Sequence, residues 1–291
     1  MTMKRTVAFL TALLLAPLLA LHAAEARPAV AKPTKPPLTP ADITQLPEGT
    51  GHLDLYLLIG QSNMKGRGFM PEEPARDPRI AMMHLKNDRW YVARHPLHLS
   101  GDPQTFAGAD NAGVGPGLSF AQTLAAQDST ARIGLIPCAV GGTQIARWQK
   151  GAGLYEEAIR RTKLALEQTK GTKATLRGVL WLQGEADSKA DRVKVYAEKL
   201  NALVDALRAD LGQPALPFVA CTIGEMRTEG RGGEKQAINA LLLDLPNHRP
   251  HTACVDARDL KSSIGDNVHY DTAAQTEIGK RFAASLQKLT R

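Results

Sequence analysis

The stretch Leu53-Asp54-Leu55-Tyr56-Leu57-Leu58-Ile59 leads directly into Gly60-Gln61-Ser62-Asn63, and it decides the fold. The first part is apolar except for Asp54, and such a nearly continuous apolar run is typical of a strand that is buried on both faces. The polar residues begin at the glycine, where the strand is expected to end. Ligands of open α/β sheets bind beyond the carboxyl ends of the strands, so these polar residues are candidates for a functional site.

Four further apolar runs lie downstream, at 132–137 (RIGLIP), 178–182 (GVLWL), 217–222 (PFVACT) and 252–256 (TACVD). Segments with apolar residues at helical spacing separate the later runs, and a closing helix is expected from Thr272 onward. Alternating strands and helices predict a parallel sheet that helices cover on both faces. We therefore predict an α/β fold, a three-layer α/β/α sandwich with a mainly parallel central sheet.

The segment 80–93 departs from this alternation. Two short apolar stretches, 80–85 and 89–93, flank Lys86-Asn87-Asp88, and this arrangement is typical of a β-hairpin. We expect a small β-hairpin insertion after the first strand.

The amino-terminal residues 1–26 have the composition of a signal peptide. Lys4 and Arg5 precede an apolar run over 7–21 that is short for a membrane-spanning helix, and Ala24-Glu25-Ala26 offers a cleavage site. Residues 27–52 form a Pro-rich leader, and one domain is expected over 53–291. The sequence thus predicts a protein that is secreted, into the periplasm or the medium, without a membrane anchor.

The composition excludes several classes of protein. A chain of 291 residues with 43% hydrophobic and 22% charged residues can bury one sizeable core, which excludes collagen-like, low-complexity and multi-span membrane proteins. The formal net charge is +7, but the basic residues are scattered. A mixed solvated surface therefore explains the charge better than nucleic-acid binding does.

The three cysteines are expected to be free and mostly buried. Cys221 and Cys254 fall in two runs that we interpret as neighbouring strands, and Cys138 lies at the end of a third. Neighbouring parallel strands seldom offer the geometry of a disulfide. A bond between Cys221 and Cys254 is the alternative that export permits.

Polar residues at the predicted strand ends and in one late loop suit acyl transfer. A serine needs a base to become a nucleophile, the base needs an acid to hold its tautomer, and the reaction needs donors that face the developing oxyanion. Candidates for all three needs are Ser62, Gly141-Gly142, Gln183, Glu185, and the pair Asp266 and His269.

Each candidate also has a purely structural explanation. Ser62 can be a helix N-cap, Gly141-Gly142 a tight turn and Asp266 a cap. The pattern is not a G-x-S-x-G elbow, because Met64 occupies the last position. The sequence has no H-E-x-x-H motif, Walker loop or zinc-spaced Cys/His set, so we expect no metal site and no nucleotide site.

Five blocks in order resemble the SGNH hydrolase superfamily, and within it the sialic-acid-specific acetylesterase-like group that includes acetylxylan esterases of carbohydrate esterase family six. The blocks are GQSNMKGRG at 60–68, GVGPGLSFA at 113–121, PCAVGGTQIARW at 137–148, WLQGEAD at 181–187 and DNVHYDTAAQ at 266–275. They extend from the first strand to the last helix. This ordered set is far more specific than any one block.

The resemblance implies a role for each matching residue. Ser62 is the expected nucleophile, His269 the general base and Asp266 the acid that orients it, with Glu185 as the alternative acid. The expected oxyanion hole is lined by the backbone N–H of Ser62, a backbone N–H from Gly141 or Gly142, and the side-chain amide of Gln183.

The resemblance further implies a serine esterase that removes O-acetyl groups from carbohydrates through an acetyl-serine intermediate and needs no cofactor. The expected substrate is an acetylated oligo- or polysaccharide, with xylan, sialic acid, a wall polymer or another sugar as alternatives. Sugar contacts are expected from the 80–93 hairpin and from Gln61, Arg147 and Trp148. Two rivals are a catalytically silent carbohydrate-binding or cell-wall-associated protein on the same fold and a short-chain lipid or thioester acylhydrolase.

Overall fold

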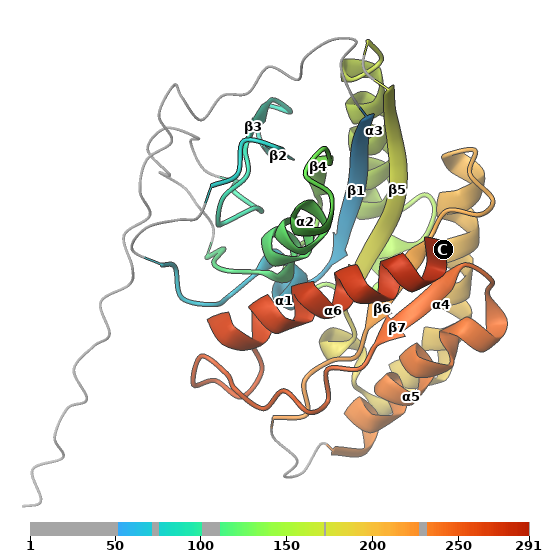
Figure 1. Ribbon diagram of the computed structural model, residues 1–291. Helices are drawn as coiled ribbons and strands as arrows, with labels where there is room; N and C mark the ends of the chain where they lie inside the picture. Colours follow the sequence, from blue (N-terminus) through green and yellow to red (C-terminus); the bar gives the residue numbers. More distant parts are fainter. Residues whose placement is uncertain (1–51, 72–75, 101–110, 172, 227–231, 291) are drawn as a thin grey trace, which may run out of the picture. The chain divides into compact units, whose positions relative to one another are not determined.

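The computed structural model of the protein describes residues 52–71, 76–100, 111–171, 173–226 and 232–290 (Figure 1). The predicted signal peptide 1–26 and all but the last residue of the leader lie outside the described residues. His52 already belongs to the first strand, one residue before the expected start of the domain.

The strands are β1 (His52–Gly60), β2 (Ile80–Met83), β3 (Trp90–Val92), β4 (Arg132–Pro137), β5 (Lys173–Leu182), β6 (Phe218–Cys221) and β7 (Thr252–Val255). The helices are α1 (Ser62–Lys65), α2 (Pro116–Gln127), α3 (Gly153–Gln168), α4 (Ala190–Asp210), α5 (Gly232–His248) and α6 (Thr272–Thr290). Short 3₁₀ helices follow β4 and β5, as η2 (Ile145–Trp148) and η3 (Glu185–Asp187).

The described strands form one sheet in the order β3-β2-β4-β1-β5-β6-β7, in which only the β2–β3 pairing is antiparallel. Helices α2 and α6 cover one face, and α3, α4 and α5 cover the other (Figure 1). The predicted three-layer sandwich is confirmed.

Strand β1 shows why the fold needs a continuous apolar run. Tyr56 and Leu58 pack into the cluster under α2 and α6, whereas Leu55 and Leu57 pack into the cluster under α3, α4 and α5. Both faces of the strand are therefore buried, and an alternating polar pattern would place polar groups in one core. Strand β5 begins five residues before the predicted run. The apolar pattern missed its first half, because those residues are partly exposed and several are polar.

The predicted hairpin 80–93 is present as β2 and β3, but it belongs to the main sheet. Ile80 pairs with Ile133 of β4 in parallel register, so β2 extends the sheet beyond β4. Arg161 of α3 donates hydrogen bonds to the carbonyl oxygens of Met83 (3.0 Å) and His84 (3.2 Å) at the turn. The turn is thus held by a helix of the core, which gives no support to its expected role in sugar recognition.

The cysteines are free, as predicted. Cys138 and Cys221 are buried and Cys254 is partly buried. In the β6–β7 register Cys254 pairs with Ala220, whereas Cys221 pairs with Val255. Adjacent residues of a strand point to opposite faces, so the thiols of Cys221 and Cys254 lie on opposite sides of the sheet and cannot form a disulfide.

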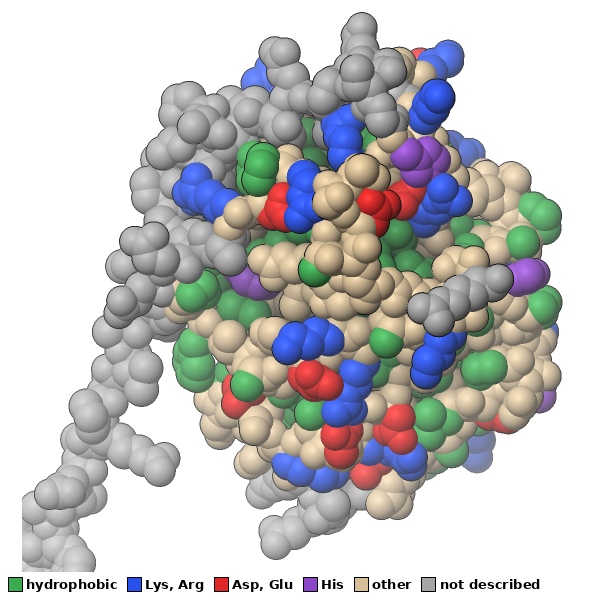
Figure 2. Space-filling view, viewed as in Figure 1, with side chains coloured by type: hydrophobic (Ala, Val, Ile, Leu, Met, Phe, Trp, Pro, Cys, Tyr) green, Lys and Arg blue, Asp and Glu red, His purple; other side chains and the backbone are tan. Residues whose placement is uncertain are grey.

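The surface carries both signs of charge. Figure 2 shows lysine and arginine side chains interspersed with aspartate and glutamate on the face in view, without a broad basic stripe. None of the helices in the described part of the chain has the length and hydropathy that a membrane-spanning segment needs.

Candidate active site

The candidate nucleophile lies where β1 turns sharply into α1. Gly60 has a φ of +134°, and a Cβ at this position would collide with the carbonyl oxygen of Leu182 in β5. Glycine is the residue that tolerates this conformation and this close approach. The next N–H, of Gln61, donates to the same carbonyl oxygen at 2.9 Å, and α1 then begins at Ser62. The turn thereby fixes Ser62 at the carboxyl edge of the sheet.

Ser62, His269 and Asp266 form a continuous hydrogen-bonded chain. The distance from Ser62 Oγ to His269 Nε2 is 2.8 Å, and that from His269 Nδ1 to Asp266 Oδ2 is 2.5 Å. The serine comes from the end of β1, while the other two come from the loop before α6, about 200 residues later. The geometry is that of a serine, a base and an orienting acid.

Asp266 is held in its orienting position by its own loop. Its Oδ1 accepts hydrogen bonds from the backbone N–H groups of Val268 (2.9 Å) and His269 (2.8 Å). Burial alone would raise the pKa of this carboxyl, but the hydrogen bonds from the His269 backbone and ring outweigh burial and lower the pKa. Asp266 is therefore ionised at neutral pH.

Glu185, the alternative acid, is placed differently. Its Oε1 accepts a hydrogen bond of 2.5 Å from Asn63 Nδ2, and its buried Oε2 has no hydrogen-bond partner among the described residues. Burial raises the pKa of Glu185, while the hydrogen bond from Asn63 opposes the shift. His269 Nδ1 hydrogen-bonds Asp266. Glu185 instead bonds Asn63, and no hydrogen bond between Glu185 and His269 is present among the described residues.

Gly141 and Gly142 lie in the loop after β4, and Gly141 lies beside the serine. A Cβ placed on Gly141 would be 3.6 Å from the Cβ of Ser62. Among the described residues, the N–H groups of Gly141 and Gly142 make no hydrogen bond. Both N–H groups remain candidates for the predicted oxyanion hole.

Gln183 does not line this hole. Its side chain is fully buried, and its Nε2 lies within hydrogen-bonding distance of Asp187 Oδ2 (2.6 Å), the carbonyl oxygen of Thr143 (2.9 Å) and Gln61 Oε1 (3.2 Å). Asp187 Oδ2 also accepts from the N–H of Ile145 at 2.8 Å. The amide hydrogens of Gln183 are thus occupied inside the protein, and we call Gln61, Gln183 and Asp187 the buried amide network.

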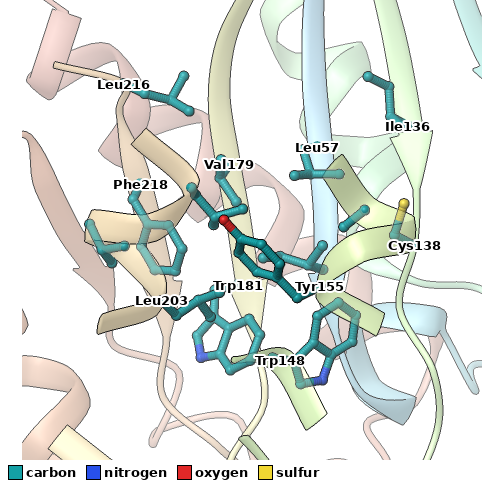
Figure 3. Close-up of a cluster of buried hydrophobic side chains, with 14 of the residues drawn as sticks. Leu57, Ile136, Cys138, Trp148, Tyr155, Val179, Trp181, Leu203, Leu216 and Phe218 are labelled. Atoms are coloured by element: carbon teal, nitrogen blue, oxygen red, sulfur yellow. The ribbon is translucent and has the colours of Figure 1, made fainter. Parts of the chain in front are cut away.

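Two of the expected sugar contacts are also internal. Gln61 is 3% exposed and accepts hydrogen bonds from Gln183 and from the N–H of Ala186. Trp148 is fully buried, donates to Thr143 Oγ1 at 3.1 Å, and meets Trp181 edge to face at 5.7 Å (Figure 3). The expectation that Trp148 contacts sugar is therefore wrong, because its side chain lies inside the protein. Gln61 is about as buried as Ser62 beside it, which is 4% exposed, so its expected contact with substrate stays a prediction.

Arg147, the third expected sugar contact, is exposed on η2. Arg67 is a further cation near the site, and sequence reasoning did not identify it. A Cβ on Gly141 would be 3.7 Å from Arg67 Nη2, so this guanidinium lies beside the serine. Its one hydrogen bond with the described residues goes from Nη1 to the carbonyl oxygen of Asn111 (3.1 Å), and its buried Nε has no partner there. No carboxylate of the described residues pairs with it.

The described residues contain no group of three or more His, Cys, Asp or Glu side chains that could hold a metal ion. Sequence reasoning also missed Asn63 and Asp187 as parts of the site. Both lie inside the quoted blocks, next to Ser62 and two residues after Glu185. Adjacency to the nucleophile was a usable signal for Asn63, whereas nothing in the sequence distinguishes Asp187 from a surface cap.

Residues 52–288 match the family model described as carbohydrate esterase, sialic acid-specific acetylesterase. The chain belongs to this family. It is also 33% identical over 248 residues to a probable carbohydrate esterase of Arabidopsis thaliana, a match that covers 79% of this chain and 88% of the plant protein. In this carbohydrate esterase the family match thus extends from the first residue of β1 almost to the end of α6.

Solved structures show the same fold. The crystal structure of the Arabidopsis thaliana protein superposes with a TM-score of 0.69 at 31% identity, covering 81% of this chain and 98% of that one. The structure of NanS gives a TM-score of 0.66 at 20% identity, with 82% and 98% covered. A carbohydrate acetylesterase from Xanthomonas citri gives 0.58 at 19% identity, with 81% and 56% covered.

Proposed function

We propose that this esterase removes O-acetyl groups from sugars through an acetyl-serine intermediate on Ser62. The observation that supports the proposal is the hydrogen-bonded chain from Ser62 Oγ through His269 to Asp266. The predicted signal peptide supports export before the enzyme acts. The family of carbohydrate acetylesterases supports the acetyl group and the sugar as substrate parts.

The reaction proceeds in two acyl transfers. His269 Nε2 takes the proton of Ser62 Oγ as the oxygen attacks the acetyl carbonyl, and Asp266 holds the imidazole by its Nδ1–H. The backbone N–H groups of Ser62 and of Gly141 or Gly142 receive the oxyanion. His269 then protonates the departing sugar oxygen, and in the second half it takes a proton from the water that releases acetate.

The Ser62→Ala variant tests this mechanism. We expect the rate on 4-nitrophenyl acetate to fall by about 10³-fold or more, because only the serine can form the acyl-enzyme. Circular dichroism is expected to show an unchanged fold. Ser188→Ala is a matched control, because the Ser188 hydroxyl bonds, among the described residues, only the carbonyl oxygen of Gly184. A rate for Ser62→Ala within tenfold of the parent enzyme contradicts the assignment.

A comparison of the acetate and octanoate esters of 4-nitrophenol distinguishes an acetylesterase from a lipid or thioester acylhydrolase. A pocket made for an acetyl group accepts 4-nitrophenyl acetate and excludes the longer chain. We expect the ratio of kcat/KM to favour the acetate by about tenfold or more, which corresponds to about 1.4 kcal/mol. Preference for the octanoate rules out a dedicated acetylesterase.

Arg67 supports an acetylated sugar that carries a carboxylate as the preferred substrate. A guanidinium binds a carboxylate through paired hydrogen bonds, and the Arg67 group beside Ser62 has no carboxylate partner among the described residues. The description of the matching family as sialic acid-specific agrees with this chemistry.

Activity on two substrates tests this preference. We expect Arg67→Gln to lower kcat/KM on an O-acetylated sialic acid by about 10²-fold, and to leave kcat/KM on an acetylated xylo-oligosaccharide within about threefold. Arg160→Gln, on the exposed surface of α3, is the control. Equal losses on the two substrates exclude Arg67 as a carboxylate-binding group.

A further inference from the structure

We propose that Asn63 is a positioning residue that holds His269 against Ser62, and that Glu185 fixes the orientation of the Asn63 amide. The inference rests on the proposed function and deepens it, because neither side chain contacts the reacting atoms. It also gives the alternative acid a role other than membership of the triad.

Asn63 connects the nucleophile to the backbone on both sides of the base. Its Nδ2 donates to the carbonyl oxygen of Val268 at 3.1 Å, and its Oδ1 accepts from the N–H of Tyr270 at 3.1 Å. Val268 and Tyr270 are the two chain neighbours of His269. Since Asn63 is fully buried and follows Ser62 directly, this pair of hydrogen bonds sets the position of the base relative to the nucleophile.

The loop that carries His269 needs such a connection. Its other hydrogen bonds are largely local, as between the N–H of Ile264 and the carbonyl oxygen of His269 (3.1 Å), and between the N–H of Asp271 and the carbonyl oxygen of Ser262 (3.3 Å). Asp266, at the same loop, is 41% exposed. A misplacement of about 1 Å in a catalytic group can cost about 10²-fold in rate. Tyr270 anchors the loop in the core after His269, and the Asn63 amide adds a direct connection from Ser62 to both sides of the base.

Glu185 determines which way the Asn63 amide faces. Its Oε1 is an acceptor 2.5 Å from Asn63 Nδ2, which places the nitrogen toward Val268 and leaves the oxygen for Tyr270. The reversed amide would place its oxygen against two other acceptors, Glu185 Oε1 and the carbonyl oxygen of Val268, and its NH₂ group against the N–H of Tyr270. A glutamine at 185 also supplies Oε1, whereas a leucine removes the acceptor.

The protein contains a matched control for this arrangement at Asn239. That side chain is also buried, it bonds the N–H (2.7 Å) and the carbonyl oxygen (3.0 Å) of Ile223, and its Nδ2 donates to Glu225 Oε1 at 2.8 Å. It is a buried asparagine that holds a strand end with a glutamate behind it, but it has no link to His269. Loss of this side chain therefore reports the cost of removing a buried amide alone.

The experiment measures kcat and KM on 4-nitrophenyl acetate per active site, with active sites counted by complete reaction with a fluorophosphonate. We expect Asn63→Ala to lower kcat by about 10²-fold with KM within about threefold. Asn239→Ala is expected to lower thermal stability by a similar amount and to leave kcat per active site within about threefold. Equal losses of kcat in the two variants overturn the proposal.

Glu185 is tested in the same assay by two substitutions. We expect Glu185→Gln to keep kcat within about threefold and Glu185→Leu to lower it by about tenfold or more. The double variant Asn63→Ala/Glu185→Leu is expected to be no slower than Asn63→Ala alone, since both act through one contact. Additive losses overturn the link, as does a Glu185→Gln variant that is as slow as Glu185→Leu.

The outcomes separate this proposal from the proposed function. A parent enzyme that is inactive on the acetate ester and unlabelled by the fluorophosphonate overturns both. An active, labelled parent enzyme with fully active Asn63 and Glu185 variants overturns the positioning role alone. If Asn63→Ala does not fold, the contrast between Glu185→Gln and Glu185→Leu decides.

Discussion

The two supports of Ser62 are built in opposite ways. The loop 138–144 carries Gly141 and Gly142, and we call it the oxyanion loop. It is supported by the buried amide network, whose members Gln61, Gln183 and Asp187 are at most 3% exposed. On the other side, Asp266 and His269 lie in a loop where their side chains are 41% and 20% exposed. The oxyanion donors must stay fixed while charge develops, and the buried network holds the segment that follows them through Thr143 and Ile145. His269 must take a proton from the attacking water during deacylation, and its partial exposure gives that water access.

The largest expected effect separates the two candidate acids. We expect Asp266→Asn to lower kcat by about 10³- to 10⁴-fold without loss of fold, because the amide favours the wrong tautomer of His269. Glu185→Gln is expected to lower kcat far less, since it keeps the contact with Asn63. Both are measured on 4-nitrophenyl acetate, with circular dichroism to check folding. A larger loss in Glu185→Gln would move the triad acid to 185.

A smaller effect is expected on the buried side, where activity and stability fall together. Asp187→Ala removes a buried carboxylate that accepts two hydrogen bonds, from Gln183 Nε2 and from the N–H of Ile145. We expect the free energy of unfolding to fall by about 3 kcal/mol and kcat to fall by about 10-fold to 10²-fold. Urea unfolding and the acetate assay measure the two losses.

Asp191→Ala provides the control for Asp187→Ala, because Asp191 is 79% exposed at the start of α4. We expect its stability to stay within about 0.5 kcal/mol of the parent enzyme. An Asp187→Ala variant with unchanged stability would show that the network does not support the oxyanion loop.

The smallest expected effect is a difference in the sign of a pH dependence. Burial raises the pKa of Asp187 above its ordinary value of 3.8 despite its hydrogen bonds. In Asp266 burial acts in the same direction, but the hydrogen bonds with His269 outweigh it and lower the pKa. The raised pKa of Asp187 contributes stability that is present below 3.8 and is lost as pH rises through the pKa of the folded protein. The lowered pKa of Asp266 contributes stability that is present above 3.8 and is lost as pH falls through the pKa of the folded protein.

Urea unfolding between about pH 3 and 7 measures this difference. We expect Asp187→Asn to become more stable relative to the parent enzyme as pH rises, and Asp266→Asn to become less stable relative to it. The second change is confined to the acid side of 3.8. The same sign in both variants would contradict the contrast between a buried and an exposed carboxylate.

The sequence predicted the parts of the molecule that follow from strand burial and order. The predicted strand 132–137 has the same first and last residues as β4, because both of its faces are apolar. The association of Ser62, Asp266 and His269 was also predicted, because the resemblance supplied the roles and the carboxyl edge of the sheet supplied the place.

Depth within the site could not be predicted in the same way. Gln61 and Gln183 follow apolar runs just as surface residues do, and Trp148 lies among polar residues. A position along the chain fixes the edge of the sheet without fixing the distance from solvent. The hairpin shows the same limit, since β2 pairs with β4 through a contact between segments about 50 residues apart. Such contacts become visible only when the chain is folded.

The edge-to-face contact of Trp148 and Trp181 gives this esterase a built-in optical probe. Trp148 Nε1 donates to Thr143 Oγ1, and the carbonyl oxygen of Thr143 accepts from Gln183. These hydrogen bonds connect the indole pair to the loop that carries Gly141 and Gly142. Trp90, the third tryptophan of the chain, lies in β3 and bonds Gln168 instead. With Trp90 replaced by phenylalanine, tryptophan fluorescence comes from Trp148 and Trp181 alone. We expect acylation of Ser62 to change this fluorescence, because Trp148 bonds Thr143 directly after Gly141 and Gly142.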